Sequence, residues 1–382
     1  MMMKKSIRPL LAAILSAYAF VGAAHADITI GVSLPLTGPA SGLGIPTKNG
    51  ISLWPDTIGG EKVKLIMLDD ASDTTQSVKN GRRFITEDKV DVIVGSTATP
   101  ASIALSAVAL EGQTVQISTS PVDLPEGKDA WTFRVAQSTP LMASALVEHM
   151  KKSGIKTYAF LGFSDAYGET WLKAFEALAS KAGLSSLATE RFARSDTSVT
   201  AQAIKLTMAR PDAILIGASG SGAAMPHKAI VERGYKGKIY QTHGAASRDL
   251  IRLGAKDVEG AIVVAGLAVM PESLPAAHPS KKLATEFVER YEQQFGAGTR
   301  NQFSAHGYDA HLLLQAAVPV ALKKGKPGTP EFRAALKDAL ENSKGVTITQ
   351  GVIRYSAKDH WGLEDNARVL LTIDKGDWKL AN

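Results

Sequence analysis

The sequence predicts an α/β protein with two Rossmann-like lobes, each built on a central parallel sheet and joined by a hinge that the chain crosses three times. Three observations lead to this prediction. The chain has 382 residues, which is more than one ordinary core holds. Short β-rich runs alternate with amphipathic segments of helical length, which is typical of parallel sheets covered by helices. The alternation occurs in two successive series, with no internal repeat and no low-complexity linker.

Strands and helices are expected in the same alternation in both series. The first series has strands at Ile28–Leu34, Val63–Leu68, Val90–Gly95 and Thr114–Ser118, and helices at 42–56, 74–87 and 100–111. The second has strands at Thr157–Gly162, 187–192, Asp212–Gly217, Lys238–Thr242 and Gly260–Gly266, and helices at 168–182, 198–209, 223–233 and 247–253.

The last part of the chain is too small to form a domain of its own. Helices at 279–296, 304–324 and 330–342 are expected to return to the first lobe, and the β-like tail Val346–Lys379 to the second. The predicted lobes are therefore 27–137 plus 270–346 and 138–269 plus 347–382. Their crossings are expected near 136–140, 267–272 and 344–350.

The N-terminus has the pattern of a secretory signal peptide over residues 1–26. Lys4, Lys5 and Arg8 precede an apolar stretch that is too short to span a bilayer, and an A-x-A cleavage signal ends at Ala26. The alternative is an N-terminal membrane anchor. Cleavage would lower the formal net charge from +6 to +3, because three basic residues and no acidic residue are lost. The sequence has no cysteine, which excludes a lipid-bearing cysteine, so we expect a protein free in the periplasm.

Polar turns follow two neighbouring strands of the first lobe. In open α/β sheets ligands bind beyond the carboxyl ends of the strands, where helix N-termini attract anions. Thr99 is expected to cap the helix that starts at Pro100, and a second polar turn precedes Pro121. An ordinary capped helix and an ordinary turn are the alternatives. The residues of this lobe predicted to bind a ligand are Thr97, Ala98, Thr99, Ser118, Thr119 and Ser120.

Turns of the second lobe supply further candidates. Tyr167 opens a helix and would offer a ring and a hydroxyl to the opposite lobe, unless it is a surface aromatic beside an Asp165 cap. Ser219 lies in a glycine-rich turn that lacks the Lys-Ser/Thr ending of a P-loop, so we expect close backbone approach and not nucleotide binding. His243 is either a hydrogen-bond donor to a ligand or a residue that only completes its turn.

Catalytic and metal-binding patterns are absent from the sequence. The histidines are scattered without an H-E-x-x-H arrangement, and there is no G-x-S-x-G elbow. Asp69, Asp70 and Asp73 could form a cation site, but Asp73 is better explained as a helix cap. The 43 basic and 37 acidic residues are almost balanced, unlike the basic face of a nucleic-acid binder. We expect no enzyme, no metal, no cofactor and no nucleic-acid partner.

Segments along the whole chain after residue 26 resemble the periplasmic solute-binding components of ABC transporters, in the branched-chain amino-acid-binding group. The resemblance is carried, in the same order and spacing, by Ile30–Gly38, Asp69–Asp73, Val92–Ser96, Ile117–Pro121, Tyr167–Glu169, Pro211–Ile214 and Tyr308–Ala310. It implies the type I periplasmic binding fold and hinge closure over a small molecule. Membrane permease and ATPase subunits are the partners it implies, and the protein is expected to be a monomer.

The resemblance also implies roles for the polar turns and a class of ligand. The family's carboxylate clamp falls on Thr97, Thr99 and 118–120, and its aromatic residue on Tyr167. Members that bind amino acids place an acid where His243 or Gly244 stands, but residues 241–246 contain none.

A buried ammonium group without a counter-charge is costly, so the resemblance favours an aromatic or other non-amino carboxylic acid. Residues 241–244 are similar to those of members that take up benzoate or hydroxycinnamate derivatives. The family's small disulfide is missing, since Ser72 and Ala98 stand at its cysteine positions. A neutral amino acid or amide as the ligand, and a periplasmic sensor or enzyme that reuses the fold, are the alternatives.

Overall fold

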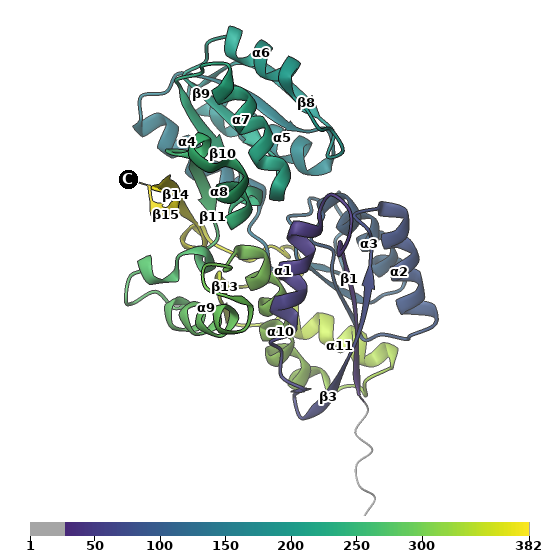
Figure 1. The fold of residues 1–382 in the computed structure, drawn as a ribbon. Coiled ribbons are helices and arrows are strands. Elements are labelled where there is room, and N and C mark those ends of the chain that lie inside the picture. Colours follow the sequence, from purple (N-terminus) through teal and green to yellow (C-terminus); the bar gives the residue numbers. More distant parts are fainter. Residues whose placement is uncertain (1–26, 382) are drawn as a thin grey trace, which may run out of the picture.

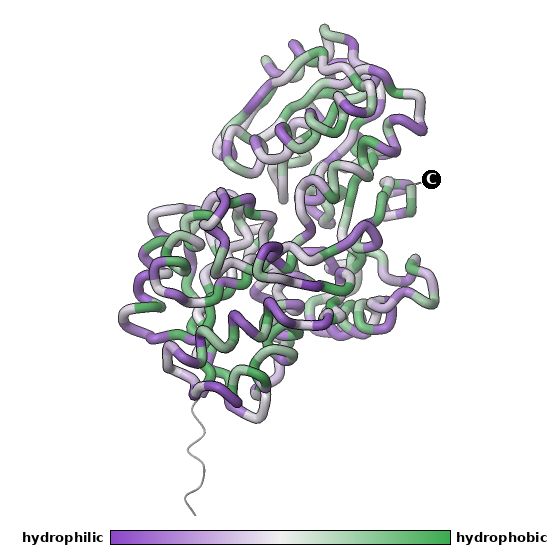
Figure 2. The backbone as a smooth tube through the Cα atoms, turned by 180° about the vertical axis from the view of Figure 1, so that it is seen from behind, coloured by the Kyte–Doolittle hydropathy of each residue, from purple (hydrophilic) through white to green (hydrophobic). Residues whose placement is uncertain are grey.

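The computed structural model describes residues 27–381, so the expected signal peptide lies outside the described residues. Figure 1 shows two lobes, each with its own sheet and covering helices. The predicted α/β class with two Rossmann-like lobes is confirmed. Hydrophobic segments run through the interior of both lobes, and the most hydrophilic segments lie mainly on the outside (Figure 2). Within residues 27–381 no helix combines the length and apolar character needed to cross a membrane.

The first lobe contains a six-stranded sheet in which only the pairing of β2 with β3 is antiparallel. Its strands, in spatial order, are β2 (Thr57–Ile58), β3 (Glu61–Asp69), β1 (Ile28–Leu34), β4 (Val92–Gly95), β5 (Val115–Ser118) and β6 (Thr132–Arg134). The helices are α1 (Ser41–Ile51), α2 (Thr74–Thr86), α3 (Thr99–Glu111), α9 (Lys281–Phe295), α10 (Gln302–Ala321) and α11 (Pro330–Glu341).

The central strands of this sheet, β1, β4 and β5, are buried on both faces, to which successive side chains point alternately. Val92 and Val94 of β4 pack in the cluster that includes α1, α9, α10 and α11. Ile93, between them, packs with Phe84 of α2 and Leu105 of α3. Strands covered on both faces read as continuous apolar runs, which is why the sequence revealed them.

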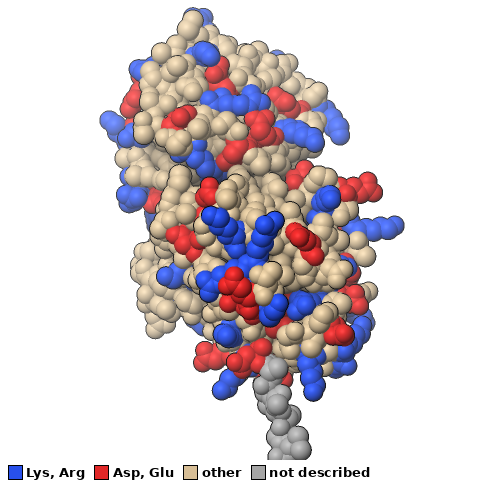
Figure 3. Space-filling view, turned by 90° about the vertical axis from the view of Figure 1, so that its right-hand side faces the viewer, with Lys and Arg blue, Asp and Glu red and all other residues tan. Residues whose placement is uncertain are grey.

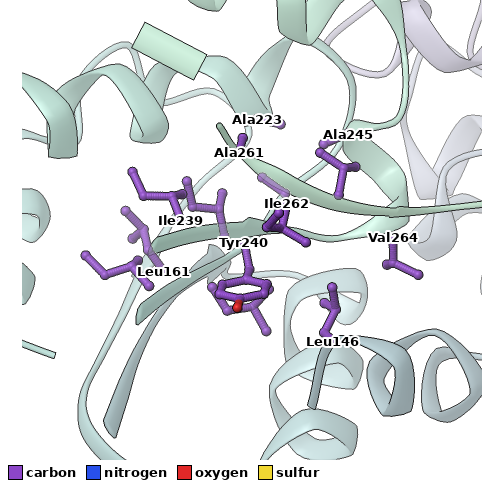
Figure 4. Packing of buried hydrophobic residues seen from close by; sticks show 14 of the residues in the cluster. Leu146, Leu161, Ala223, Ile239, Tyr240, Ala245, Ala261, Ile262 and Val264 are labelled. Atoms are coloured by element: carbon purple, nitrogen blue, oxygen red, sulfur yellow. The ribbon is translucent and has the colours of Figure 1, made fainter. Parts of the chain in front are cut away.

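The second lobe contains a seven-stranded sheet with an antiparallel edge formed by the chain's last two strands. Its strands, in spatial order, are β15 (Asp377–Leu380), β14 (Val369–Asp374), β11 (Ile262–Ala265), β10 (Lys238–Gln241), β9 (Ala213–Gly217), β7 (Thr157–Phe163) and β8 (Ser185–Phe192). The helices are α4 (Thr139–Lys152), α5 (Ala166–Lys181), α6 (Thr200–Met208), α7 (Ala224–Glu232) and α8 (Arg248–Gly254). Figure 4 shows Tyr240 of β10 in the core of this lobe, among side chains such as Leu146 and Ile262.

The chain's tail differs from the expectation that everything after residue 346 joins the second lobe. β12 (Val346–Ile348) and β13 (Gly351–Ile353) form a separate hairpin, and Ile348, Ile353 and Tyr355 are buried in the first lobe's core. The Tyr355 hydroxyl donates to the carbonyl oxygen of Arg134 at 2.7 Å. Only β14 and β15 join the second sheet, because the hairpin's apolar side chains are buried in the first lobe's core.

The three crossings between the lobes follow from this arrangement. The first connects β6 to α4 and the second connects β11 to α9. The third lies between Leu363, which packs on the first lobe, and β14. It was predicted near 344–350, which is wrong, because residues 346–363 remain with the first lobe. The other predicted limits of the lobes stay a prediction.

Buried glutamine side chains tie the crossings together. Nε2 of Gln137 donates to the carbonyl oxygen of Ala367 at 2.8 Å, which links the first crossing to the third. Oε1 of Gln350 accepts from the backbone N–H of Ala268 at 3.4 Å, which links the hairpin to the second crossing. Both glutamines are completely buried, and their amides link the crossings to one another.

Helices α1 and α10 approach each other backbone to backbone, through glycines on both. A Cβ added at Gly50 would lie 1.9 Å from the carbonyl oxygen of Ser304, and one at Gly307 would lie 2.3 Å from that of Thr47. No side chain fits at such distances. This contact positions the start of α10, which reaches the cleft.

Gly50→Ala is therefore expected to lower the free energy of unfolding by about 1–3 kcal/mol, because the two helices must move apart. Gly42→Ala, in the same helix, would place its Cβ 3.4 Å from a carboxylate oxygen of Asp249. It is expected to be neutral or to stabilise by up to about 1 kcal/mol through helix propensity. Urea unfolding of both variants measures the difference, and equal stability would contradict the close helix contact.

Candidate functional site

A narrow pocket with a free volume of about 10 Å³ lies between the two lobes, at the carboxyl ends of their strands. It receives side chains from α1, α10 and the turns after β4 and β5 on one lobe. The other lobe contributes the start of α5 and the turns after β8, β9 and β10. The lining residues are Leu43, Thr97, Thr99, Thr119, Ser120, Pro121, Tyr167, Arg194, Ser219, His243, Gly244, Gln302, Phe303 and His306.

Most of the residues predicted from the sequence line this pocket, but two do not. Ala98 packs its methyl group into a small apolar cluster with Leu43 and Phe303. The hydroxyl of Ser118 pairs with Ser102 at 2.9 Å and donates to the carbonyl oxygen of Ser120 at 2.8 Å. Ser118 therefore shapes the turn that carries Thr119 and Ser120 and does not line the pocket.

Thr99 has a different local role from the one expected. The residue that caps α3 is Ala98, without a side-chain cap hydrogen bond, and Thr99 is already the first helical residue. The predicted cap is therefore wrong by one position. As a consequence the Thr99 hydroxyl has no intramolecular hydrogen bond among residues 27–381, and it lines the pocket beside the free N–H groups of the helix start.

Three threonine hydroxyls form a chain within the first-lobe wall. Thr47 donates to main-chain carbonyl oxygens of Leu43 and Phe303, and Thr97 donates to Thr47 at 3.0 Å. The contact of 2.9 Å between Thr97 and Thr119 must then use the proton of Thr119, since a hydroxyl has only one. Thr97 is thereby committed to the wall, while Thr119 keeps a lone pair towards the pocket.

Tyr167 contributes its ring to the pocket, but its hydroxyl bonds within its own lobe. The backbone N–H of Gly244 donates to this hydroxyl at 3.0 Å. Thr242 donates to the carbonyl oxygen of Ala218, so Tyr167 must donate to Thr242, at 2.9 Å. Burial raises the pKa of Tyr167 to about 12, which keeps the proton in place. The expectation that this hydroxyl would reach the opposite lobe is wrong. Its two hydrogen bonds are to Thr242 and Gly244, in the turn that carries His243.

His243 and His306 approach the pocket from opposite lobes, from the short helix η2 (His243–Ala245) and from α10. Burial lowers the pKa of His243 to about 3 and that of His306 to about 4, so both rings are neutral at pH 7. The main chain of Thr119 lies near His306 and opposes this shift. Yet neither nitrogen of His306, nor Nδ1 of His243, makes a hydrogen bond of normal geometry within residues 27–381. Buried polar atoms without partners at a pocket are typical of a ligand site.

Arg194 is the one charged residue that lines the pocket, and it was not singled out from the sequence. Its Nε donates to Asp165 at 2.5 Å, and its Nη1 donates to the hydroxyl of Ser219 at 3.0 Å. The guanidinium carbon lies 4.0 Å from the centre of the Phe163 ring. Its position just after β8 was the available signal, because it is a strand end facing the cleft.

Gln302 connects the two lobes directly. Its Nε2 donates to the carbonyl oxygen of His243 at 2.7 Å, and its Oε1 accepts from the backbone N–H of Gly266 at 3.1 Å. Gln302, Phe303 and His306 belong to the first turns of α10, which the sequence placed in the first lobe without indicating that they reach the cleft. The close contact of α10 with α1 helps to place them there.

This arrangement is suited to holding a small molecule between the two lobes. Within residues 27–381, no cluster of three or more potential metal ligands occurs. Asp73, a candidate cation ligand, accepts from the backbone N–H of Gln76 and caps α2, as expected. On the face drawn in Figure 3, basic side chains lie beside acidic ones over both lobes. The fold and the pocket together define a two-lobed solute-binding protein.

Comparison with known protein families identifies the family to which this two-lobed protein belongs. A model described as periplasmic binding protein matches residues 27–371, and the chain belongs to this family, whose members bind solutes and are not enzymes. A relative named Leu/Ile/Val-binding protein homolog 3, from Brucella melitensis, is 25% identical over 88% of this chain and 89% of that protein.

Solved structures agree on the fold. An extracellular ligand-binding receptor from Rhodopseudomonas palustris HaA2 has 44% identity and a TM-score of 0.92, over 94% of this chain and all of that one. A solute-binding protein of an ABC transporter from R. palustris, in complex with benzoate, has 17% identity and a TM-score of 0.77, over 93% of this chain and 95% of that one. The type I periplasmic binding fold is thus confirmed.

Tyr167→Phe is expected to destabilise the protein without any ligand, by about 1–3 kcal/mol, because the Gly244 N–H loses its buried acceptor. Chemical unfolding of the free protein measures this. Tyr235→Phe, which removes a hydroxyl bonded to Pro211 away from the pocket, serves as the control and is expected to cost less. A Tyr167→Phe variant of normal stability but weakened binding would place the hydroxyl on the ligand instead.

His306 is expected to make stability depend on pH. Unfolding releases the ring to its ordinary pKa of 6.5, so the unfolded chain binds more protons than the folded one between pH 6.5 and about 4. Stability contributed by the neutral buried ring is complete above this window and is lost as the pH falls through it. His306→Gln should therefore reduce the slope of the free energy of unfolding against pH in this window by up to about 1.4 kcal/mol per pH unit.

His227 provides the matched control, since burial also lowers its pKa to about 4 and it does not line the pocket. His227→Gln should flatten the same pH dependence while leaving binding unchanged. Unfolding curves at several pH values measure both variants, and parallel curves for wild type and His306→Gln would contradict the assignment.

Proposed function

We propose that this chain is the periplasmic solute-binding component of an ABC uptake system, and that it binds an aromatic or other non-amino carboxylic acid between its lobes. The observation that carries this proposal is the lack of a negative charge in the pocket. Among residues 27–381, no acidic side chain lines it. An acid finds donors there, whereas the ammonium group of an amino acid finds no counter-charge.

The first-lobe wall is proposed to hold the carboxylate. The start of α3 offers main-chain N–H groups and the positive end of a 13-residue helix. Thr99, whose hydroxyl is unpaired among residues 27–381, and Ser120 line the same wall of the pocket. Thr119 is proposed to contribute as well, exchanging its bond to Thr97 for one to the ligand. Thr97 and Ser118 are then supports that orient these groups.

The body of the ligand is proposed to lie against rings. Tyr167 and His243 have ring centroids 5.9 Å apart, and Phe303 and His306 lie on the facing lobe. Flat neutral surfaces of this kind favour an aromatic or other apolar body. The unpartnered nitrogens of the two histidines can still bond to oxygen atoms of the ligand, and Ser219 completes this side.

Closure of the lobes is proposed as the binding step. The bond from Gln302 to His243 exists only when the lobes are together, and a ligand that contacts both walls favours that state. The closed form would then be recognised by a membrane permease with its ATPase subunits. The signal-peptide pattern of residues 1–26 supports export to the periplasm, and we propose a monomer.

Binding of a neutral amino acid is the second candidate. It is favoured by the names of the relatives, which are called Leu/Ile/Val-binding proteins. For this function the ammonium group would have to pair with carbonyl or hydroxyl oxygens alone. The two candidates therefore predict opposite results with the same set of compounds.

Thermal unfolding with benzoate, 4-hydroxycinnamate, leucine and isoleucine separates them. An acid that binds is expected to add about 2.7 kcal/mol of stability at a free concentration one hundred times its dissociation constant. Thr99→Val should weaken acid binding roughly tenfold, through the loss of a hydrogen bond to a charged group. Stabilisation by leucine or isoleucine, with none by the acids, would falsify the acid proposal.

A further inference from the structure

The guanidinium of Arg194 is held rigidly from several sides. Asp165 engages its Nε edge, Ser219 engages Nη1 and the ring of Phe163 covers one face. Asp165 is itself held, because its other oxygen caps α5 by accepting from the backbone N–H groups of Tyr167 and Gly168. An arginine oriented in this way loses little conformational entropy when it makes a further hydrogen bond.

One edge of this guanidinium remains available. The N–H groups of Nη2 have no hydrogen-bond partner within residues 27–381, and Arg194 lines the pocket on the second lobe. The proposed carboxylate site is on the first lobe, at the start of α3. A ligand that spans the pocket therefore presents its far end, and not its carboxylate, to Arg194.

The charge around Arg194 indicates the kind of group it accepts. The close ion pair with Asp165 already neutralises the guanidinium, and both pocket histidines are neutral at pH 7. A second carboxylate at this end would bring a net negative charge beside Asp165, which is unfavourable in a partly desolvated place. A hydroxyl or carbonyl oxygen accepts the free N–H groups without that cost.

Resting on the function proposed above, we infer that Arg194 is a specificity-determining residue that selects acids with an uncharged oxygen acceptor at the end remote from the carboxylate. It distinguishes such acids from equally large acids that have an apolar end. The reason is that a polar group built to bond a ligand oxygen is left unpaired by an analogue that lacks it.

The test uses pairs of acids that differ in one group: 4-hydroxybenzoate against 4-methylbenzoate, and 4-hydroxycinnamate against 4-methylcinnamate. Titration calorimetry with the wild-type protein should give at least a tenfold tighter dissociation constant for the hydroxyl member of the pair that fits. In Arg194→Gln the ratio of the two dissociation constants, methyl acid to hydroxyl acid, should fall below about threefold. The dissociation constant of the methyl acid itself should change less than about threefold.

Arg191→Gln is the matched control. Arg191 is three positions earlier in the chain and pairs with Glu169 on the surface, outside the pocket, so this variant should keep the tenfold ratio. Arg194→Lys keeps the charge beside Asp165 but loses the planar donor edge. Arg194→Lys should therefore also lose the preference for the hydroxyl acid over the methyl acid. This variant tests the inference if Arg194→Gln fails to fold.

Three outcomes would overturn the inference. Equal weakening of both members by Arg194→Gln would mean that Arg194 holds the carboxylate. An unchanged ratio would remove Arg194 from ligand selection. Tighter binding of benzene-1,4-dicarboxylate than of 4-hydroxybenzoate would contradict the uncharged acceptor. In all three cases acids still bind, so the proposed function stands, whereas binding of leucine alone would reject the proposed function and the inference with it.

Discussion

The side-chain amide of Gln302 lies where the two lobes meet, and its two ends form hydrogen bonds to the second lobe and to the second crossing. Its nitrogen donates to the carbonyl oxygen of His243 and its oxygen accepts from the N–H of Gly266. A fully buried amide is stable only when such bonds are made. Gln302 belongs to the first lobe and His243 to the second. The hydrogen bond between them therefore stabilises this placement of the two lobes relative to each other. The pocket depends on it, since the same turn of α10 brings His306 opposite His243.

The chemistry of the pocket is determined by the polar groups of its walls that have no hydrogen-bond partner within the described part of the chain. The hydroxyl protons of Thr97, Ser118 and Tyr167 are all donated to neighbouring oxygens of the protein. Thr99, the two histidine rings and one edge of Arg194 keep unpaired donors or acceptors. Two walls of different character result, one with helix-start N–H groups and hydroxyls, and the other with a positioned guanidinium.

The fold was largely predictable because its central strands are buried on both faces and many of its helices are amphipathic, so these elements are marked by a local pattern. The tail shows where this fails. Val346–Ile353 has the same β-like composition as the strands of the second sheet, but Ile348 and Ile353 fill a space beside α10 and α11. Which core an apolar strand enters depends on the shape of the available gap, and that shape is created by residues far away in the chain.

The sequence by itself determined the α/β class and the turns at strand ends that form the pocket. It also showed that residues 241–246 carry no acid to balance an ammonium group. Local rules suffice for these, because a cap, a turn or an apolar run involves only near neighbours. The tertiary structure alone decided that the Thr99 hydroxyl has no partner within residues 27–381, that the Tyr167 hydroxyl is hydrogen-bonded within its lobe, and that Arg194 and the start of α10 reach the pocket. A hydroxyl has one proton to give, and the acceptor that takes it is chosen by atoms brought close only when the chain has folded.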